Sequence, residues 1–380
     1  MDSGMPLVLT LALRNLFQDR LRFAAAVTGI VFSVVLILVQ MGLFYGFGRM
    51  VTLIVDHTSA DIWIMSKGTQ YFEDLSILDS DMREELRALD GVADAIPVVA
   101  GFSAWIPPEG GLVGIFVIAS DPASGLAPWN IVEGGLDDLA APGTVTLERS
   151  YAAELGVSAR GEAAQVRGHP VTVGPVTSGL RSFTTRPYVF ADFRNARSYV
   201  GLPANLVTYF LVRMKPGADL ERLRQDALSR ISGIEALTPD QFRARSRNFW
   251  LYRTGAGAAL VAGALLSVIV GTVIIAQTLY SSTKEHLYEF AMVRAIGASN
   301  RYIYRVIACQ ALVNALIGLS VATVISIAVG HLTATSIIPV VITPGLVTIA
   351  FAVTLVMCVA SGLASIVRII RVDPASVLTR

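Results

Sequence analysis

Four long stretches without a charged residue constrain this chain more than any other feature. They cover residues 23–48, 254–283, 306–330 and 332–367. A bilayer core is about 30 Å thick, so a spanning helix needs roughly 20 apolar residues. Pro339 and Pro344 interrupt the last stretch, so its helix should begin near Gly345. The sequence therefore predicts four membrane helices, the last over 345–367, with a short outer loop at 331–344 before it.

The positions of lysine and arginine predict the direction in which the chain crosses the membrane. Short cytoplasmic segments are rich in these residues. They occur in the N-terminal segment 1–22, in the loop 284–305 and in the tail 368–380, whereas 331–344 contains neither. We therefore expect both termini in the cytoplasm and residues 49–253 outside it. Leucines share one face of segment 1–22, which is either an amphipathic helix on the inner membrane surface or the polar start of the first span.

The region 49–253 reads as a folded α+β domain. Strand-like patterns occur at 61–65, 93–99, 207–214 and 234–237, and helical patterns that end at glycines occur at 79–89 and 219–231. The similar pieces ALDGVADAIP and RISGIEALTP, unless they match by coincidence, indicate two βαβ halves near 55–104 and 201–240 that form one subdomain. Between them, 105–200 predicts an inserted β-rich subdomain, with strands near 113–119, 144–147, 164–166 and 171–173.

The sequence contains no recognisable catalytic constellation. A P-loop needs Gly-Lys followed by Ser or Thr, because its lysine neutralises nucleotide phosphates. None of the three lysines, Lys67, Lys215 and Lys284, follows a glycine. HExxH, GxSxG and CxxC are absent as well, and Asp56 with His57 reads as a solvated pair at a helix end. We therefore expect no enzyme activity, no cofactor and no metal site, and any ATPase has to be another subunit.

The segment 284–305 is the most informative short stretch. Charged and apolar residues alternate there on an expected helix that a glycine closes. Apolar residues exposed beside charges suit docking into a groove on a partner, although a loop that only reverses the chain would look similar. The residues concerned are Glu285, Glu289, Phe290, Met292, Arg294 and Gly297.

Small residues recur every four positions in the second predicted span, at Gly263, Ser267 and Gly271. Such a face lets two helices approach closely in lipid. The partner helix is either one of the same chain or one of a second copy.

The four uncharged stretches contain polar residues but no ionisable carboxylate, lysine or arginine. Carriers that couple transport to an ion or proton gradient usually need ionisable groups within the membrane. The pattern disfavours secondary transport and favours a subunit that transmits motion.

Three segments resemble the FtsX-like permeases, a superfamily that includes the MacB efflux permeases, the LolC and LolE permeases and FtsX. EFAMVRAIGAS at 289–299 resembles their coupling segment, LALRNLFQDRLRFAAAVTGIVFSV at 11–34 their entry helix, and RVDPASVLTR at 371–380 their closing signature. The stretches at 40–68 and 91–111 look most like DevC-type permeases.

The resemblance implies a permease of the bacterial inner membrane whose dimer binds two cytosolic ABC ATPase subunits. The residues of 284–305 named above would then be coupling residues. DevC-type relatives imply a periplasmic adaptor, an outer-membrane channel and an amphiphilic, lipid-like or peptide substrate. An FtsX-like alternative is a signalling subunit that activates a cell-wall hydrolase. Membrane lipid is an expected partner, whereas a net charge of +1 without a basic patch gives no reason to expect nucleic acid.

Overall fold

The computed structural model describes residues 20–74, 76–121, 125–180, 182, 186–285, 292, 300–334 and 338–370. The chain divides into two compact units. One, the helical unit, comprises Met1–Gly46 and Ala256–Arg380, and the other, the α/β unit, comprises Phe47–Gly255.

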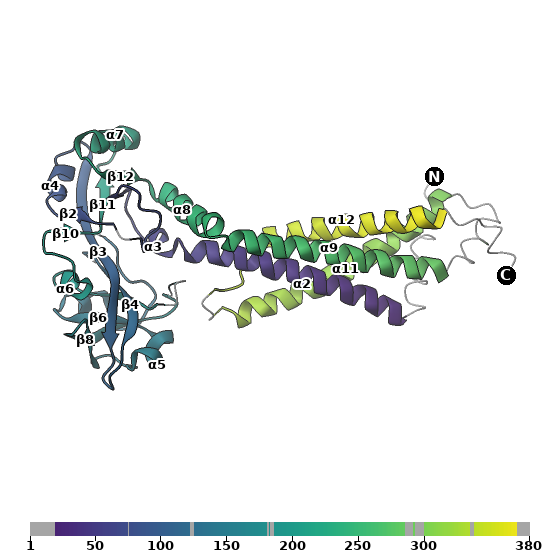
Figure 1. Ribbon diagram of the computed structural model, residues 1–380, viewed down its shortest axis with the longest axis horizontal. Coiled ribbons are helices and arrows are strands. Elements are labelled where there is room, and N and C mark those ends of the chain that lie inside the picture. The colour runs from purple at the N-terminus through teal and green to yellow at the C-terminus, as the bar shows by residue number, and fades with distance from the viewer. Residues whose placement is uncertain are drawn as a thin grey trace. The chain divides into compact units, whose positions relative to one another are not determined.

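Four long helices form the helical unit (Figure 1): α2 (Arg20–Met50), α9 (Ala256–Glu285), α11 (Asn300–Leu332) and α12 (Pro344–Ile370). Each contains a segment long and apolar enough to cross a membrane, at Phe23–Met50, Ala256–Gln277, Ala308–Leu332 and Pro344–Ser361. The expected layout of one span, a large inserted domain and three further spans is therefore confirmed. The last helix begins one residue before the expected Gly345, because proline is well tolerated in the first turn of a helix.

Glycines set the close contacts of the helical unit. A Cβ on Gly318 would lie 2.5 Å from Ile30, and a Cβ on Gly29 would collide with Ile274. Residues 338–342 run against α2, where the Val341 amide donates to the Gly42 carbonyl at 3.1 Å. A Cβ on Gly46 would collide with the Pro339 carbonyl. The predicted outer loop is thus held on α2 by a pair of glycines four residues apart.

The α/β unit is built on one large mixed sheet. Its strands are β1 (Ile62–Ser66), β3 (Val92–Ile106), β4 (Val113–Ala119), β5 (Ile131–Glu133), β6 (Thr144–Glu148), β7 (Ala163–Val166), β8 (His169–Thr177), β9 (Tyr188–Phe190), β11 (Tyr209–Met214) and β12 (Ile234–Leu237). A separate pair joins β2 (Leu78–Asp79) and β10 (Leu206–Val207). The helices are α3 (Leu53–Asp56), α4 (Met82–Arg87), η1 (Leu136–Ala140), η2 (Arg149–Tyr151), α5 (Ala152–Leu155), α6 (Ala196–Val200), α7 (Leu220–Arg230), α8 (Pro239–Asn248) and η3 (Phe249–Arg253).

The two expected βαβ halves interleave. Strands lie in the order β12-β1-β11-β3 with every neighbouring pair antiparallel, so each half contributes strands that flank a strand of the other. This is the ferredoxin-like arrangement of two split βαβ units. The β-rich part, β4 to β9, is inserted between β3 and β11, and Figure 1 shows the long strand β3 running through both parts.

Strand β1 is buried on both faces. Successive strand residues point to opposite faces. Ile62 and Ile64 belong to a core with Leu223 of α7, while Trp63 packs on the other face against Phe242 of α8, with ring centroids 5.3 Å apart. Helices α7 and α8 therefore cover opposite faces of the sheet at β1, because both faces of this strand are apolar.

Capping residues define the helices that cover this sheet. Asp219 accepts from the backbone amides of Glu221 and Arg222 at the start of α7. Thr238 and Gln241 form a capping box around α8, whose first residue is Pro239. Both arrangements satisfy amides that have no partner within the helix. Helix α8 is followed by η3 and then by α9.

Candidate functional site

The segment proposed from the sequence to contact an ATPase falls mostly outside the described residues. Glu285 is the last residue of α9, and Met292 is helical with its side chain 44% exposed. Glu289, Phe290, Arg294 and Gly297 lie outside the described residues. The helix that follows, α11, begins at Asn300.

The small-residue face of α9 packs inside the chain. A Cβ on Gly263 would lie 2.9 Å from the Gln40 amide of α2, and one on Gly271 would lie 2.5 Å from Ser33 and collide with Met357 of α12. Ser267 between them is 6% exposed, and its hydroxyl donates to the Gly263 carbonyl at 2.8 Å. All of these contacts are made within one chain. The exposed face of α9 consists of large apolar residues: Leu265, Leu266, Ile269, Val270 and Val273.

An aromatic cluster joins the two ends of the α/β unit. Phe47, from the last turns of α2, meets Trp250 of η3 edge to face at 6.5 Å between ring centroids. Tyr71, from the segment after β1, stacks on Phe249 at 4.8 Å and meets Trp250 at 4.9 Å. Aromatic pairs at such distances contribute about 0.5–1.5 kcal/mol each beyond the area that they bury. The first residues of the unit therefore contact its last residues, which in turn contact the loop that carries Tyr71.

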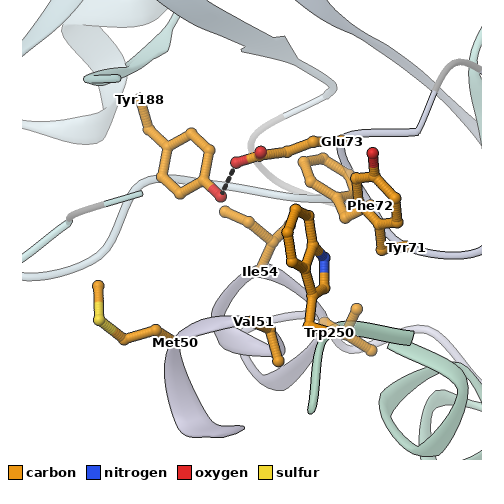
Figure 2. Close-up of a pocket in the computed structure, with 9 residues that line it drawn as sticks. Met50, Val51, Ile54, Tyr71, Phe72, Glu73, Tyr188 and Trp250 are labelled. Carbon is orange, nitrogen blue, oxygen red and sulfur yellow. Dashed lines mark hydrogen bonds between the residues drawn. The ribbon is translucent and has the colours of Figure 1, made fainter. Parts of the chain in front are cut away.

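A small cavity lies beside this cluster (Figure 2). Its walls include Met50, Val51 and Ile54 on one side and Tyr71, Phe72 and Trp250 on another. Its volume of about 10 Å³ is room for roughly one water molecule. Among the described residues, it is the aromatic packing around this space, rather than a ligand-sized pocket, that characterises the region.

Glu73 brings a buried carboxylate to the cavity wall. It is 4% exposed, and its Oε1 accepts from the Tyr188 hydroxyl at 2.7 Å and from the Ser182 hydroxyl at 2.8 Å. Burial, together with the charge of Glu73, raises the pKa of Tyr188 well above its ordinary value. A tyrosine is already protonated at physiological pH, and the raised pKa extends to higher pH the range in which Tyr188 donates to the carboxylate.

The loop that carries Tyr71 to Glu73 is fastened to the sheet. The Tyr209 hydroxyl of β11 donates to the carbonyls of Phe72 at 2.8 Å and Asp74 at 3.0 Å. Burial, with Asp74 and Glu73 nearby, raises the pKa of Tyr209 well above its ordinary value. The loop that carries Tyr71 is thus hydrogen-bonded to the central sheet.

Asp56 and His57 do not form a proton-transfer pair with each other. The Asp56 carboxylate lies 3.4 Å from Arg243 and accepts from Thr52 at 2.8 Å. The His57 ring stacks on Trp129 at 3.8 Å. In the part of the chain that the structure describes, no three His, Cys, Asp or Glu side chains gather as a metal site.

Sequence reasoning did not single out the aromatic cluster. Its members come from three separate segments, and only the run FWLY at 249–252 shortly before α9 stands out in the sequence. Helix α8 was missed as well, although Thr238, Pro239 and Gln241 are the residues typical of a helix start.

Two family models match the chain. The MacB-like periplasmic core domain matches residues 23–230, and the FtsX-like permease C-terminal domain matches residues 261–374. Similar solved structures include the periplasmic region of MacB from Actinobacillus actinomycetemcomitans, at 11% identity over 51% of this chain and 94% of that chain, with a TM-score of 0.36. The extracellular domain of the ABC-type transporter YknZ from Gram-positive bacteria is another, at 16% identity over 43% and 90%, with a TM-score of 0.32. No curated protein matches.

Proposed function

We propose that this chain, which belongs to the family of permeases with a MacB-like periplasmic core domain and an FtsX-like C-terminal region, is the permease subunit of an ABC-type exporter. Permeases of this family work with a separate ATPase and are not themselves enzymes. Two ATPase subunits would bind a dimer of the chain through segment 284–305. Their hydrolysis cycle would move the α/β unit, which acts on an amphiphilic, lipid-like or peptide substrate together with a periplasmic adaptor and an outer-membrane channel.

The observation that supports a mechanical role is the aromatic cluster of Phe47, Tyr71, Phe249 and Trp250. It binds the last turns of α2 to the residues that precede α9, and Tyr209 bonds the loop that carries Tyr71 to the sheet. A subunit that transmits motion needs such a stiff junction, because a loose linker absorbs displacement without passing it on. The lack of a ligand-sized pocket among the described residues of this junction fits transmission rather than catalysis.

Charge reversal in the coupling segment tests the contact with the ATPase. The complex is purified from native membranes, and ATP hydrolysis is measured for the wild type, Glu289→Lys and Arg294→Glu. The control is Glu109→Lys, at an exposed turn between β3 and β4. We expect hydrolysis to fall in both coupling variants and to persist in the control. Wild-type hydrolysis in an intact complex of either coupling variant would remove segment 284–305 from the mechanism.

Disulfide cross-linking tests the dimer. Because Ser267 is buried against its own chain, a contact between copies through α9 has to use the opposite, exposed face. Ile269→Cys should then give a dimer adduct under oxidation, whereas Ser267→Cys should give none. An adduct from Ser267→Cys alone would contradict this assignment and return the small-residue face to the dimer interface.

The proteins that co-purify with the complex separate export from signalling. An adaptor with a coiled-coil hairpin, or a neighbouring gene that encodes one, is the expected result for an exporter. Capture of a cell-wall hydrolase instead, with hydrolase activity that depends on ATP, would replace export with the signalling function.

A further inference from the structure

Arginines are concentrated where the α/β unit continues into the candidate spans. Residues 239–255, just before α9, contain four arginines and a single acidic residue, and Arg49 lies in the last turn of α2. Basic residues close to the ends of spans are normally concentrated on the cytoplasmic side. Here they lie on the side of the periplasmic core domain, so their accumulation requires a specific reason.

Two of these arginines are neutralised within the unit. Arg243 contacts Asp56 at 3.4 Å and Asp240 at 2.8 Å. Arg245 pairs with Glu235 and donates to the Thr69 carbonyl at 3.1 Å. Their side chains are about a quarter exposed, so these pairs fasten α8 to its surroundings and leave little charge for a partner.

The other three arginines carry uncompensated charge. Arg49, Arg247 and Arg253 are exposed, and none has a carboxylate partner among the residues that the structure describes. Arg253 donates to the neutral amide oxygen of Gln70 at 3.2 Å. Three positive charges are therefore exposed on the surface of the α/β unit, near the points where the chain enters and leaves it.

All three lie close to the ends of the candidate spans. Arg49 is one residue from the end of the first span, at Met50. The stem of Arg247 passes Gly48, whose Cβ position is 3.8 Å from Arg247 Cδ. Arg253 precedes the first residue of α9 by three positions, so the chain places it within about 11 Å of that helix start. Tyr252, 61% exposed, adds the amphipathic ring typical of a membrane interface.

We propose that Arg49, Arg247 and Arg253 form a binding surface for the anionic headgroups of phospholipids in the leaflet next to the α/β unit. Guanidinium groups bind phosphate oxygens through paired hydrogen bonds. Phospholipid headgroups are the phosphates that lie next to the ends of membrane spans. The ring of Tyr252 lies at the level of the same headgroups. Lipid binding at this surface holds the chain ends of the α/β unit at the membrane. This role does not depend on which substrate the protein transports.

Thermal unfolding of the full chain in a neutral detergent tests this surface. All four tryptophans, at positions 63, 105, 129 and 250, belong to the α/β unit, so intrinsic fluorescence follows that unit in the intact protein. A lipid that binds only the native state raises the unfolding temperature in a concentration-dependent way. Phosphatidylglycerol is titrated into the micelles, with phosphatidylethanolamine as the zwitterionic comparison.

The test variant is Arg49→Gln/Arg247→Gln/Arg253→Gln, and the matched control is Arg194→Gln/Arg222→Gln/Arg230→Gln, three exposed arginines on α7 and the segment before α6. Each arginine near an anionic surface strengthens binding about fivefold, so the test variant should need on the order of 100-fold more phosphatidylglycerol for half-maximal stabilisation. The control should stay within about threefold of wild type. Arg49→Gln/Arg247→Gln, which keeps the Gln70 contact, should show about 25-fold.

Three results would overturn the proposal. One is a test variant that folds and responds to phosphatidylglycerol like the wild type. Another is equal stabilisation of the wild type by phosphatidylethanolamine. The third is displacement of phosphatidylglycerol by an equal concentration of inorganic phosphate, which would identify a site for the free ion. If the triple variant does not fold, the double variant decides by the same criteria.

Discussion

Replacing Tyr188 by phenylalanine removes one oxygen atom and isolates the contribution of the buried Tyr188–Glu73 hydrogen bond. The hydroxyl donates to Glu73 Oε1 at 2.7 Å, and both residues are at most 4% exposed. A hydrogen bond to a charged group contributes about 1.5–3 kcal/mol to stability. The aromatic ring keeps its contacts, for example with Phe116 at 5.9 Å. We therefore expect Tyr188→Phe to lower the free energy of unfolding of the α/β unit by that amount.

The loss should be visible as a lower unfolding temperature. For a unit of roughly 200 residues, 1 kcal/mol corresponds to about 2–4 °C, so Tyr188→Phe should lower the midpoint by about 3–12 °C. Tryptophan fluorescence of the full chain measures this, because every tryptophan belongs to the unit. Tyr252→Phe, the same change at a side chain 61% exposed, is the matched control and should shift the midpoint by less than about 2 °C.

Equal midpoints for the two variants would refute the reasoning. They would mean that Glu73 recovers the lost donor from elsewhere, so that the carboxylate does not depend on Tyr188. A drop in ATP hydrolysis by the complex, with the midpoint unchanged, would instead assign the hydroxyl a role in transmission without one in stability.

Three further results follow from the same structure. Tyr188 has a raised pKa and adds stability below pH 10 that is lost as pH rises above it, so Tyr188→Phe should flatten the alkaline side of the stability profile measured by fluorescence. Glu148, 1% exposed, accepts from two hydroxyls and two backbone amides at the ends of β6 and β8. Glu148→Ala should therefore cost about 3–5 kcal/mol in chemical denaturation, against less than about 1 kcal/mol for exposed Glu133→Ala. Gly46→Ala should destabilise the helical unit by about 1–3 kcal/mol in thermal circular dichroism because its Cβ meets the Pro339 carbonyl, whereas Gly345→Ala has open space and should not.

Local properties of the chain were predictable without the structure. Each strand expected at 113–119, 144–147 and 234–237 is present within a residue, because alternation and turn residues act over a few positions. The extent of α7 was recognisable for the same reason: Asp219 caps its start, and Gly233 lies in the turn after its end. The interleaving of the two βαβ halves could not, since antiparallel pairing of β1 with β11 joins residues about 150 positions apart.

The sequence by itself determined that the chain crosses a membrane four times around a large inserted domain. Whether a helix can span the bilayer depends on the composition of about 20 consecutive residues, and that composition can be read directly from the sequence. Tertiary structure alone decided that the small face of α9 meets α2 and α12, and that Phe47, Tyr71, Glu73, Tyr188 and Trp250 meet at one place. Those contacts depend on how distant segments pack, and packing is a property of the whole fold.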